Sequence, residues 1–88
     1  MIRFRKRQEW ETFLDHLKEA LARMGIAYRE TGRIRSEGAL CNVRGKEILI
    51  VNRFLHPMDK AELVRRELKG RDLESLFLKP EVREFLGG

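Results

Sequence analysis

The chain has a single cysteine, two prolines and no long apolar stretch in its 88 residues. The lone Cys41 cannot form a disulfide within the chain, so we expect a reducing, cytoplasmic setting. No run approaches the roughly 18 apolar residues of a membrane span, which argues against a membrane protein. The basic N-terminus is not followed by an apolar core, so it does not resemble a signal peptide.

Uncharged polar side chains are also scarce: Asn, Ser and Thr occur twice each and Gln once. Charged residues make up 38% of the chain, with thirteen Arg and six Lys among them. This combination is typical of thermophilic proteins. The hydrophobic share of 42% suffices for one small core, so we expect a single domain over 1–88, with 1–7 as a basic arm.

The net charge of +5 is unevenly distributed. The arm carries +4, 8–28 carries −2, 29–53 carries +3 and 54–88 is balanced. Such patches can bind nucleic acid, although in an Arg-rich protein they are more often solvated surface. The candidate nucleic-acid-binding residues are those of the arm and of a predicted hairpin turn: Arg3, Arg5, Lys6, Arg7, Arg44 and Lys46.

The segment 39–52 reads as a β-hairpin around which the rest of the chain is organised. Arg44-Gly45 is suited to a two-residue turn, because Gly supplies the positive φ that tight hairpins need. This turn pairs Cys41 with Ile48, so that Cys41, Ile48 and Ile50 line one face, and Leu40, Leu49 and Val51 the other. The aliphatic run 48–51 favours a strand that is covered on both faces.

A helix is predicted over 8–24, where apolar residues recur at offsets of three and four. Gly25 would end it in a Schellman-type cap, with Ile26 against Leu21. A short strand is expected over 26–30, followed by a weak strand or loop over 33–37. Pro57 and Asp59 suit the start of a second helix over 57–69, which Gly70 ends.

Shorter helices are predicted over 73–77, capped by Asp72, and over 81–86, opened by Pro80. The expected fold is therefore α+β, a small antiparallel sheet built on the hairpin 39–52 and packed by helices. If both faces of the central strand are covered, the second layer comes either from the C-terminal helices or from a second copy of the chain.

The titratable residues do not form a recognisable catalytic or metal site. His16 lies off the apolar stripe of its helix, and His56 precedes Pro57, where a helix-capping role is favoured over acid–base chemistry. Cys41, in a strand predicted to be buried, is expected to behave as a small hydrophobe. Asn52 and Arg53 at the strand exit could line a cleft, but an Asn there more often caps the strand-to-helix loop. No ligand spacing for a metal and no phosphate-binding loop is present, so no cofactor is expected.

The segment 48–70 resembles the core of ImmA/IrrE-type zinc peptidases, in which a strand ending in Asn leads into a helix bearing HExxH. Ile50-Val51-Asn52 and Leu55 match the strand and loop, and Leu63, Glu67 and Leu68 match the helix. Arg66 and Gly70 stand where the zinc histidines would be, and Glu67 stands at the general base. The resemblance implies a relative without the metal. The hairpin, the Asn52 loop and the tail also resemble small uncharacterised bacterial proteins, which implies no activity.

The sequence therefore favours a non-catalytic binding or interaction module that forms a homo-oligomer, with no membrane partner. The alternative is a nucleic-acid-binding protein that uses the basic arm and the hairpin arginines. The third possibility is a degenerate hydrolase. Nucleic-acid binding would fall steeply with salt, whereas apolar association would not.

Overall fold

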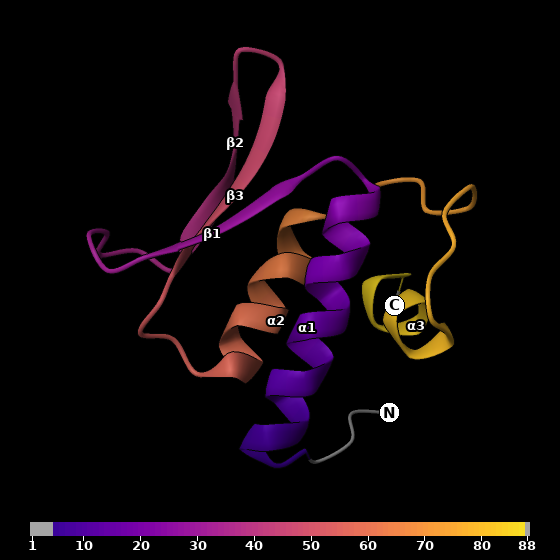
Figure 1. Ribbon diagram of the computed structural model, residues 1–88, viewed down its shortest axis with the longest axis horizontal. Helices are drawn as coiled ribbons and strands as arrows, with labels where there is room; N and C mark the ends of the chain where they lie inside the picture. The colour runs from indigo at the N-terminus through magenta and orange to yellow at the C-terminus, as the bar shows by residue number, and fades with distance from the viewer. Residues whose placement is uncertain (1–4, 88) are drawn as a thin grey trace.

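A computed structural model describes residues 5–87 and confirms the predicted α+β class (Figure 1). The elements follow in the order α1 (Arg7–Arg23), β1 (Ala27–Thr31), β2 (Gly38–Val43), β3 (Lys46–Asn52), α2 (Pro57–Glu67) and α3 (Pro80–Gly87).

Helix α1 forms because its apolar residues recur on one side, which is buried in the core. The buried residues are Trp10, Phe13, Leu14, Leu17, Ala20 and Leu21. The helix ends as predicted: the Ile26 N–H donates to the Leu21 carbonyl at 2.9 Å and the Gly25 N–H to the Ala22 carbonyl at 3.0 Å. These are the two hydrogen bonds of a Schellman motif.

Strands β2 and β3 form the predicted hairpin. Arg44 and Gly45 have φ values of 54° and 82°, which is the conformation of a tight two-residue turn. The antiparallel register places Cys41 opposite Ile48 and Leu40 opposite Leu49, as the turn predicts. The turn end of the hairpin projects beyond the helices (Figure 1).

The sheet is mixed, which corrects the prediction of an antiparallel sheet. The strand order is β1-β3-β2, and β1 runs parallel to β3, with Ala27 opposite Ile48. The reason is that β1 and β2 are not neighbours. The connection 32–37 carries the chain from one side of β3 to the other, so β1 and β3 point the same way.

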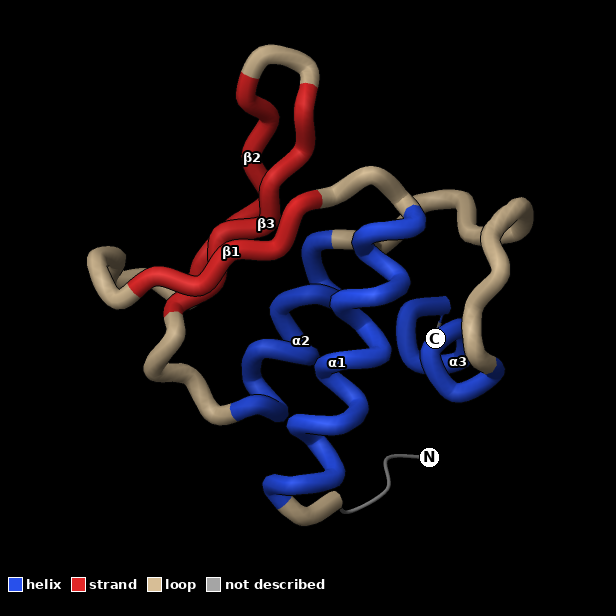
Figure 2. Tube along the Cα trace, in the orientation of Figure 1, coloured by secondary structure: helices blue, strands red, loops and turns tan. Residues whose placement is uncertain are grey.

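Helices α1 and α2 cover one face of the sheet, where Leu49 and Val51 of β3 are fully buried in the core. Helix α3 lies beside α1, where Phe85 packs against Trp10 and Phe13, and does not extend over the sheet (Figure 2). Ile48 and Ile50, on the second face, are half-buried. The alternative in which the C-terminal helices cover the second face of 48–51 is therefore wrong for residues 5–87: the structure has two layers, and the sheet has an open face. Cover by a second copy of the chain, the other alternative, stays a prediction.

Helix α2 begins at Pro57, and the Nδ1 atom of His56 accepts a hydrogen bond from the Met58 N–H at 3.0 Å, which confirms the predicted capping role. The helix predicted over 73–77 is wrong. There Asp72 accepts from the Glu74 N–H at 3.0 Å and the chain makes one turn. This turn gives way to an extended lead-in to α3, because the residue before a proline disfavours the helical conformation.

Candidate functional site

The open face of the sheet is a feature that the packing of the core leaves unexplained. Its rows follow from the register: Ala27, Ile48 and Cys41 form one row across the strands, and Arg29, Ile50 and Ala39 form the next. Val43 and Lys46 lie beyond the first row, towards the turn, and the Val43 residue is 51% exposed. An uncovered sheet face normally carries polar side chains, so this mainly apolar one is typical of an interface.

Cys41 lies on this face and is exposed, so the expectation of a buried cysteine is wrong. The predicted alternation of faces holds, but it is Leu40 and not Cys41 that points towards the helices. An exposed thiol beside apolar neighbours is accessible to solvent and would be covered if the face were occupied.

Charge is segregated between the two faces of the sheet. The acidic residues Glu30 and Glu47 lie on the helix-covered face, and each pairs with a basic residue there. Glu30 meets Lys60 at 3.0 Å, and Glu47 meets Arg71 at 2.6 Å. The open face carries basic Arg29 and Lys46, no carboxylate, and no ion pair to residues 5–87. A partner that binds this face must therefore either leave these two cations in contact with water or provide acidic groups that pair with them.

The residues with shifted pKa values belong to the packing of the sheet on the helices. Burial, with the hydrogen bond to Glu30 at 2.8 Å, raises the pKa of Tyr28. Burial alone would raise the pKa of Glu30, but hydrogen bonds from Tyr28 and Lys60 outweigh it and hold that pKa below its ordinary value. Similarly, the hydrogen bond between Arg71 and Glu47 lowers the pKa of Glu47 and raises that of Arg71. These groups are paired with one another, which is a structural role.

The Glu30 pairing predicts acid sensitivity. Because the folded-state pKa of Glu30 lies below its ordinary value of 4.5, its contribution to stability is present above pH 4.5 and is lost as the pH falls through the folded-state pKa. We expect Glu30→Gln to lower the free energy of unfolding at pH 7. The difference between the free energies of unfolding at pH 7 and at low pH, measured by urea melts, should therefore be smaller in this variant than in wild type. Glu84→Gln, which changes an exposed carboxylate with no ion pair to residues 5–87, is the control. An unchanged gap in Glu30→Gln would contradict the prediction.

The part of the basic arm that the structure describes is engaged with the protein. Arg5 lies 4.5 Å from the ring centre of Phe13 and meets Glu81 of α3 at 3.6 Å. Arg7 pairs with Glu11 at 3.4 Å. The Lys6 backbone N–H donates to Glu9 at 3.0 Å, while its side chain is exposed. Arg3 lies outside the described residues.

The two groups of predicted nucleic-acid-binding residues are not brought together. Arg44 and Lys46 lie at the exposed turn of the hairpin, whereas Arg5 and Arg7 lie at the start of α1. Figure 1 shows these places at opposite ends of the molecule. A single short ligand could not contact both groups.

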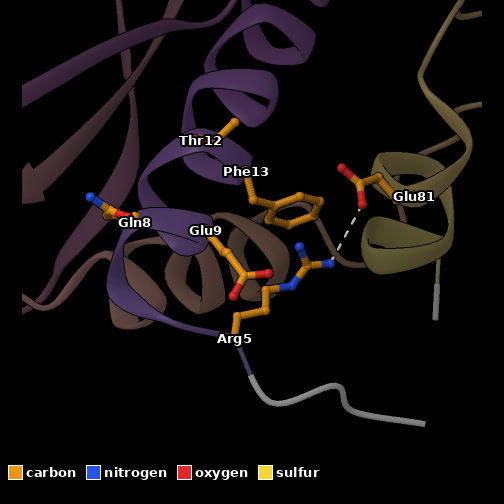
Figure 3. A pocket seen from close by; sticks show the side chains of 6 residues that line it. All are labelled: Arg5, Gln8, Glu9, Thr12, Phe13 and Glu81. Carbon is orange, nitrogen blue, oxygen red and sulfur yellow. Dashed lines mark ion pairs between the residues drawn. The ribbon is translucent and has the colours of Figure 1, made fainter.

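A hollow of about 300 Å³ lies where α1, α3 and the start of the described chain meet. Figure 3 shows the Arg5 side chain passing under the Phe13 ring towards Glu81, so its cationic group is already paired. The remaining lining residues are Gln8, Glu9 and Thr12. The hollow is open and has no unpaired buried group, so its residues are explained by the docking of α3 and the arm on α1.

The other residues singled out from the sequence have structural surroundings. His16 is half-buried between α1 and α3, with Nδ1 3.6 Å from Glu81. The Asn52 side chain accepts a hydrogen bond from the Phe54 N–H at 3.0 Å, which confirms its predicted role in the strand-to-helix loop. It also donates to the carbonyls of Ile34 and Ser36, at 3.3 and 3.1 Å, which was not predicted.

The positions that carry the zinc-peptidase resemblance do not form a metal site within residues 5–87. Glu67 accepts a hydrogen bond from the Leu40 N–H at 2.8 Å, which occupies the outer edge of β2. Arg66 pairs with Glu37 at 2.7 Å, and Gly70 follows the end of α2. No group of three or more His, Cys, Asp or Glu side chains lies together in this part of the chain.

Sequence reasoning missed two surface features. Arg29 was not recognised as part of the open face, although its alternation with Tyr28 and Glu30 would have indicated it. No role is predicted for Phe54 from the sequence, yet it is 73% exposed beside Arg53. Phe54 could have been identified because it follows two polar residues at the end of a strand and does not belong to any helical or strand repeat of apolar residues.

No helix within residues 5–87 is long and apolar enough to cross a membrane. Comparison of the chain with known protein families, with curated proteins and with solved structures finds no match in any of the three.

Proposed function

We propose that the chain is a non-catalytic interaction module that self-associates through the open face of its sheet. The observation that carries the proposal is the apolar character of that face: Ile48 and Ile50 at its centre, flanked by Ala27, Ala39 and Cys41, in a layer that the chain's own helices leave uncovered. Covering these side chains would remove apolar surface from water, which is the main driving force for association.

A second copy is the occupant that the pattern of rows favours. If two copies pack face to face about a two-fold axis parallel to β3, then β3 faces β3, and β1 of one copy faces β2 of the other. Each row of side chains then lies over the same row of the second copy, with its order reversed. Ile50 would meet Ile50, and the long side chain of Arg29 would lie over the small Ala39. The two isoleucines form the centre of the contact, and at its flanks the large Arg29 opposes the small Ala39 across sheets packed about 10 Å apart. This arrangement separates the two Arg29 side chains, so like charges do not meet.

The size of the face sets the expected strength of the dimer. Three strands spaced about 4.8 Å apart, with about five residues each, offer fewer side chains than the 20–30 per partner of a standard interface. We therefore expect a concentration-dependent dimer with a dissociation constant on the order of micromolar and not an obligate one.

The test is sedimentation velocity over a concentration series, under reducing conditions because the exposed Cys41 could otherwise cross-link copies. Wild type should shift from monomer to dimer. Ala39 is exposed in the single chain, so Ala39→Lys should not disturb the fold. It should raise the dissociation constant of the dimer at least tenfold, because it places a lysine opposite Arg29 of the other copy. Phe77→Lys is the control, since Phe77 is 90% exposed and lies outside the sheet.

Charge reversal checks the orientation. Ala39→Glu should retain or strengthen the dimer, because the new carboxylate would face Arg29 of the second copy. Equal weakening by Ala39→Lys and Ala39→Glu would overturn the two-fold axis along β3. A wild-type protein that stays monomeric at millimolar concentration would overturn self-association altogether.

A further inference from the structure

The loop that follows β1 and the turn that follows β3 lie side by side and are held together by hydrogen bonds. Asn52 donates through its side chain to the carbonyls of Ile34 and Ser36 and accepts from the Phe54 N–H at 3.0 Å. The Arg53 N–H donates to the Thr31 carbonyl at 3.0 Å. The two segments are therefore one pre-formed surface. We call Arg33, Arg35, Arg53 and Phe54 the arginine–phenylalanine corner.

Phe54 offers a flat apolar surface to solvent at this corner. It is 73% exposed, and the Arg53 guanidinium lies 4.9 Å from its ring centre. Both side chains lie close over Gly32, where an added Cβ would come within 2.9 Å of Arg53 Nε and 3.0 Å of Phe54 Cε2. The Phe54 ring and the Arg53 guanidinium thus form a cation–π pair that is held over Gly32 and remains open to solvent.

The corner is strongly basic. The segments 31–36 and 52–58 contain three arginines and no acidic residue. Arg33, Arg35 and Arg53 are all exposed, and none makes an ion pair with residues 5–87. The nearest acidic residue along the loop, Glu37, is paired with Arg66 at 2.7 Å. By contrast, the arginines of the arm that are described, Arg5 and Arg7, are paired.

We propose that the corner binds single-stranded nucleic acid, with one base stacked on Phe54 and the neighbouring phosphates contacted by the three arginines. A stacking ring beside a cluster of cations is the combination by which proteins bind single strands without sequence preference. An acidic peptide would match the charge but would leave the ring without a planar partner. The site is separate from the predicted candidates at the arm and the hairpin turn, and it does not depend on dimer formation.

The test is fluorescence anisotropy with a short labelled oligothymidylate and oligouridylate, titrated at several salt concentrations. Wild type should bind at low salt, and affinity should fall with rising salt. Phe54→Leu should lower affinity about tenfold, because stacking on one base is lost while the charge is unchanged. Phe77→Leu is the matched control, because it removes another exposed phenylalanine and should have no effect.

The charge contribution is tested by the triple variant Arg33→Gln, Arg35→Gln, Arg53→Gln. It should flatten the slope of log affinity against log salt by about two units, since each contact to a single strand contributes about 0.7. Arg44→Gln with Lys46→Gln, at the hairpin turn, should leave affinity within about twofold. Circular dichroism verifies that each variant is folded, which is expected because all these side chains are exposed.

Any one of the following results would overturn the proposal. The first is no binding by folded wild type at low salt. The second is a larger loss in the hairpin-turn variant than in the corner variants. The third is an unchanged affinity in Phe54→Leu, or equal binding of polyglutamate with the same dependence on Phe54, because either result would remove base stacking from the interaction. Binding by the Ala39→Lys variant as tight as that of wild type would support a site that is independent of self-association.

Discussion

Replacing Gly38 by alanine is expected to lower the free energy of unfolding by about 2–4 kcal/mol. Gly38 opens β2 with a φ of +132°, a conformation that residues with a Cβ rarely adopt. An added Cβ would overlap the backbone carbonyl oxygen of Ile50 in the neighbouring strand. Backbone atoms in the middle of a sheet cannot move aside as a flexible side chain can. The start of β2 must therefore separate from β3.

Urea melts followed by circular dichroism measure this loss, and Gly45→Ala in the hairpin turn is the matched control. Gly45 also has a positive φ, of +82°, but an added Cβ there meets no atom within 4 Å. Its substitution should cost only the left-handed conformation, about 1 kcal/mol. Equal losses for Gly38→Ala and Gly45→Ala would show that the overlap with Ile50 is relieved at no cost, contrary to the prediction.

The elements that the sequence predicts correctly are those specified by nearby residues. Helix α1 is defined by an apolar repeat and its Schellman cap, both of which lie within a few positions of one another. The turn at Arg44-Gly45 fixes the register of β2 on β3, because a two-residue loop leaves a single pairing. His56 before Pro57 likewise determines where α2 begins.

The order of the strands could not be predicted, because it depends on contacts between distant segments. β1 is compatible with either edge of the hairpin by its own composition. It joins β3 in parallel because the connection 32–37 crosses the end of the sheet, where Asn52 holds two of its carbonyls. Asn52 lies eighteen positions after Ile34, and nothing in the sequence indicates which backbone carbonyls its side chain will contact.

The open face was not predictable for a different reason. A run of aliphatic residues indicates that a strand avoids water, but it does not indicate what covers it. Leu49 and Val51 meet the helices of the chain, whereas no helix within residues 5–87 covers Ile48 and Ile50. The same limit applies to charge: the pairing of Arg7 with Glu11 follows from helical spacing, but that of Arg5 with Glu81 requires the tertiary fold.

The difference between the two faces can be measured with two neighbouring residues. Leu49→Ala is expected to cost about 2–5 kcal/mol, because Leu49 is 0% exposed between the sheet and the helices, and its truncation leaves a cavity. Ile50→Ala removes as many carbon atoms as Leu49→Ala, yet at low protein concentration it should cost only about 1 kcal/mol, because the Ile50 side chain is already partly in water.

Repeating both urea melts at high protein concentration links stability to the proposed dimer. Association stabilises wild type and Leu49→Ala alike by mass action, so the cost of Leu49→Ala should remain the same. The cost of Ile50→Ala should grow with concentration, because this variant loses the contact between the two central isoleucines. If Ile50→Ala instead costs as much as Leu49→Ala at the lowest concentration, then a single chain covers both faces of β3, and the open face is not available to a second copy.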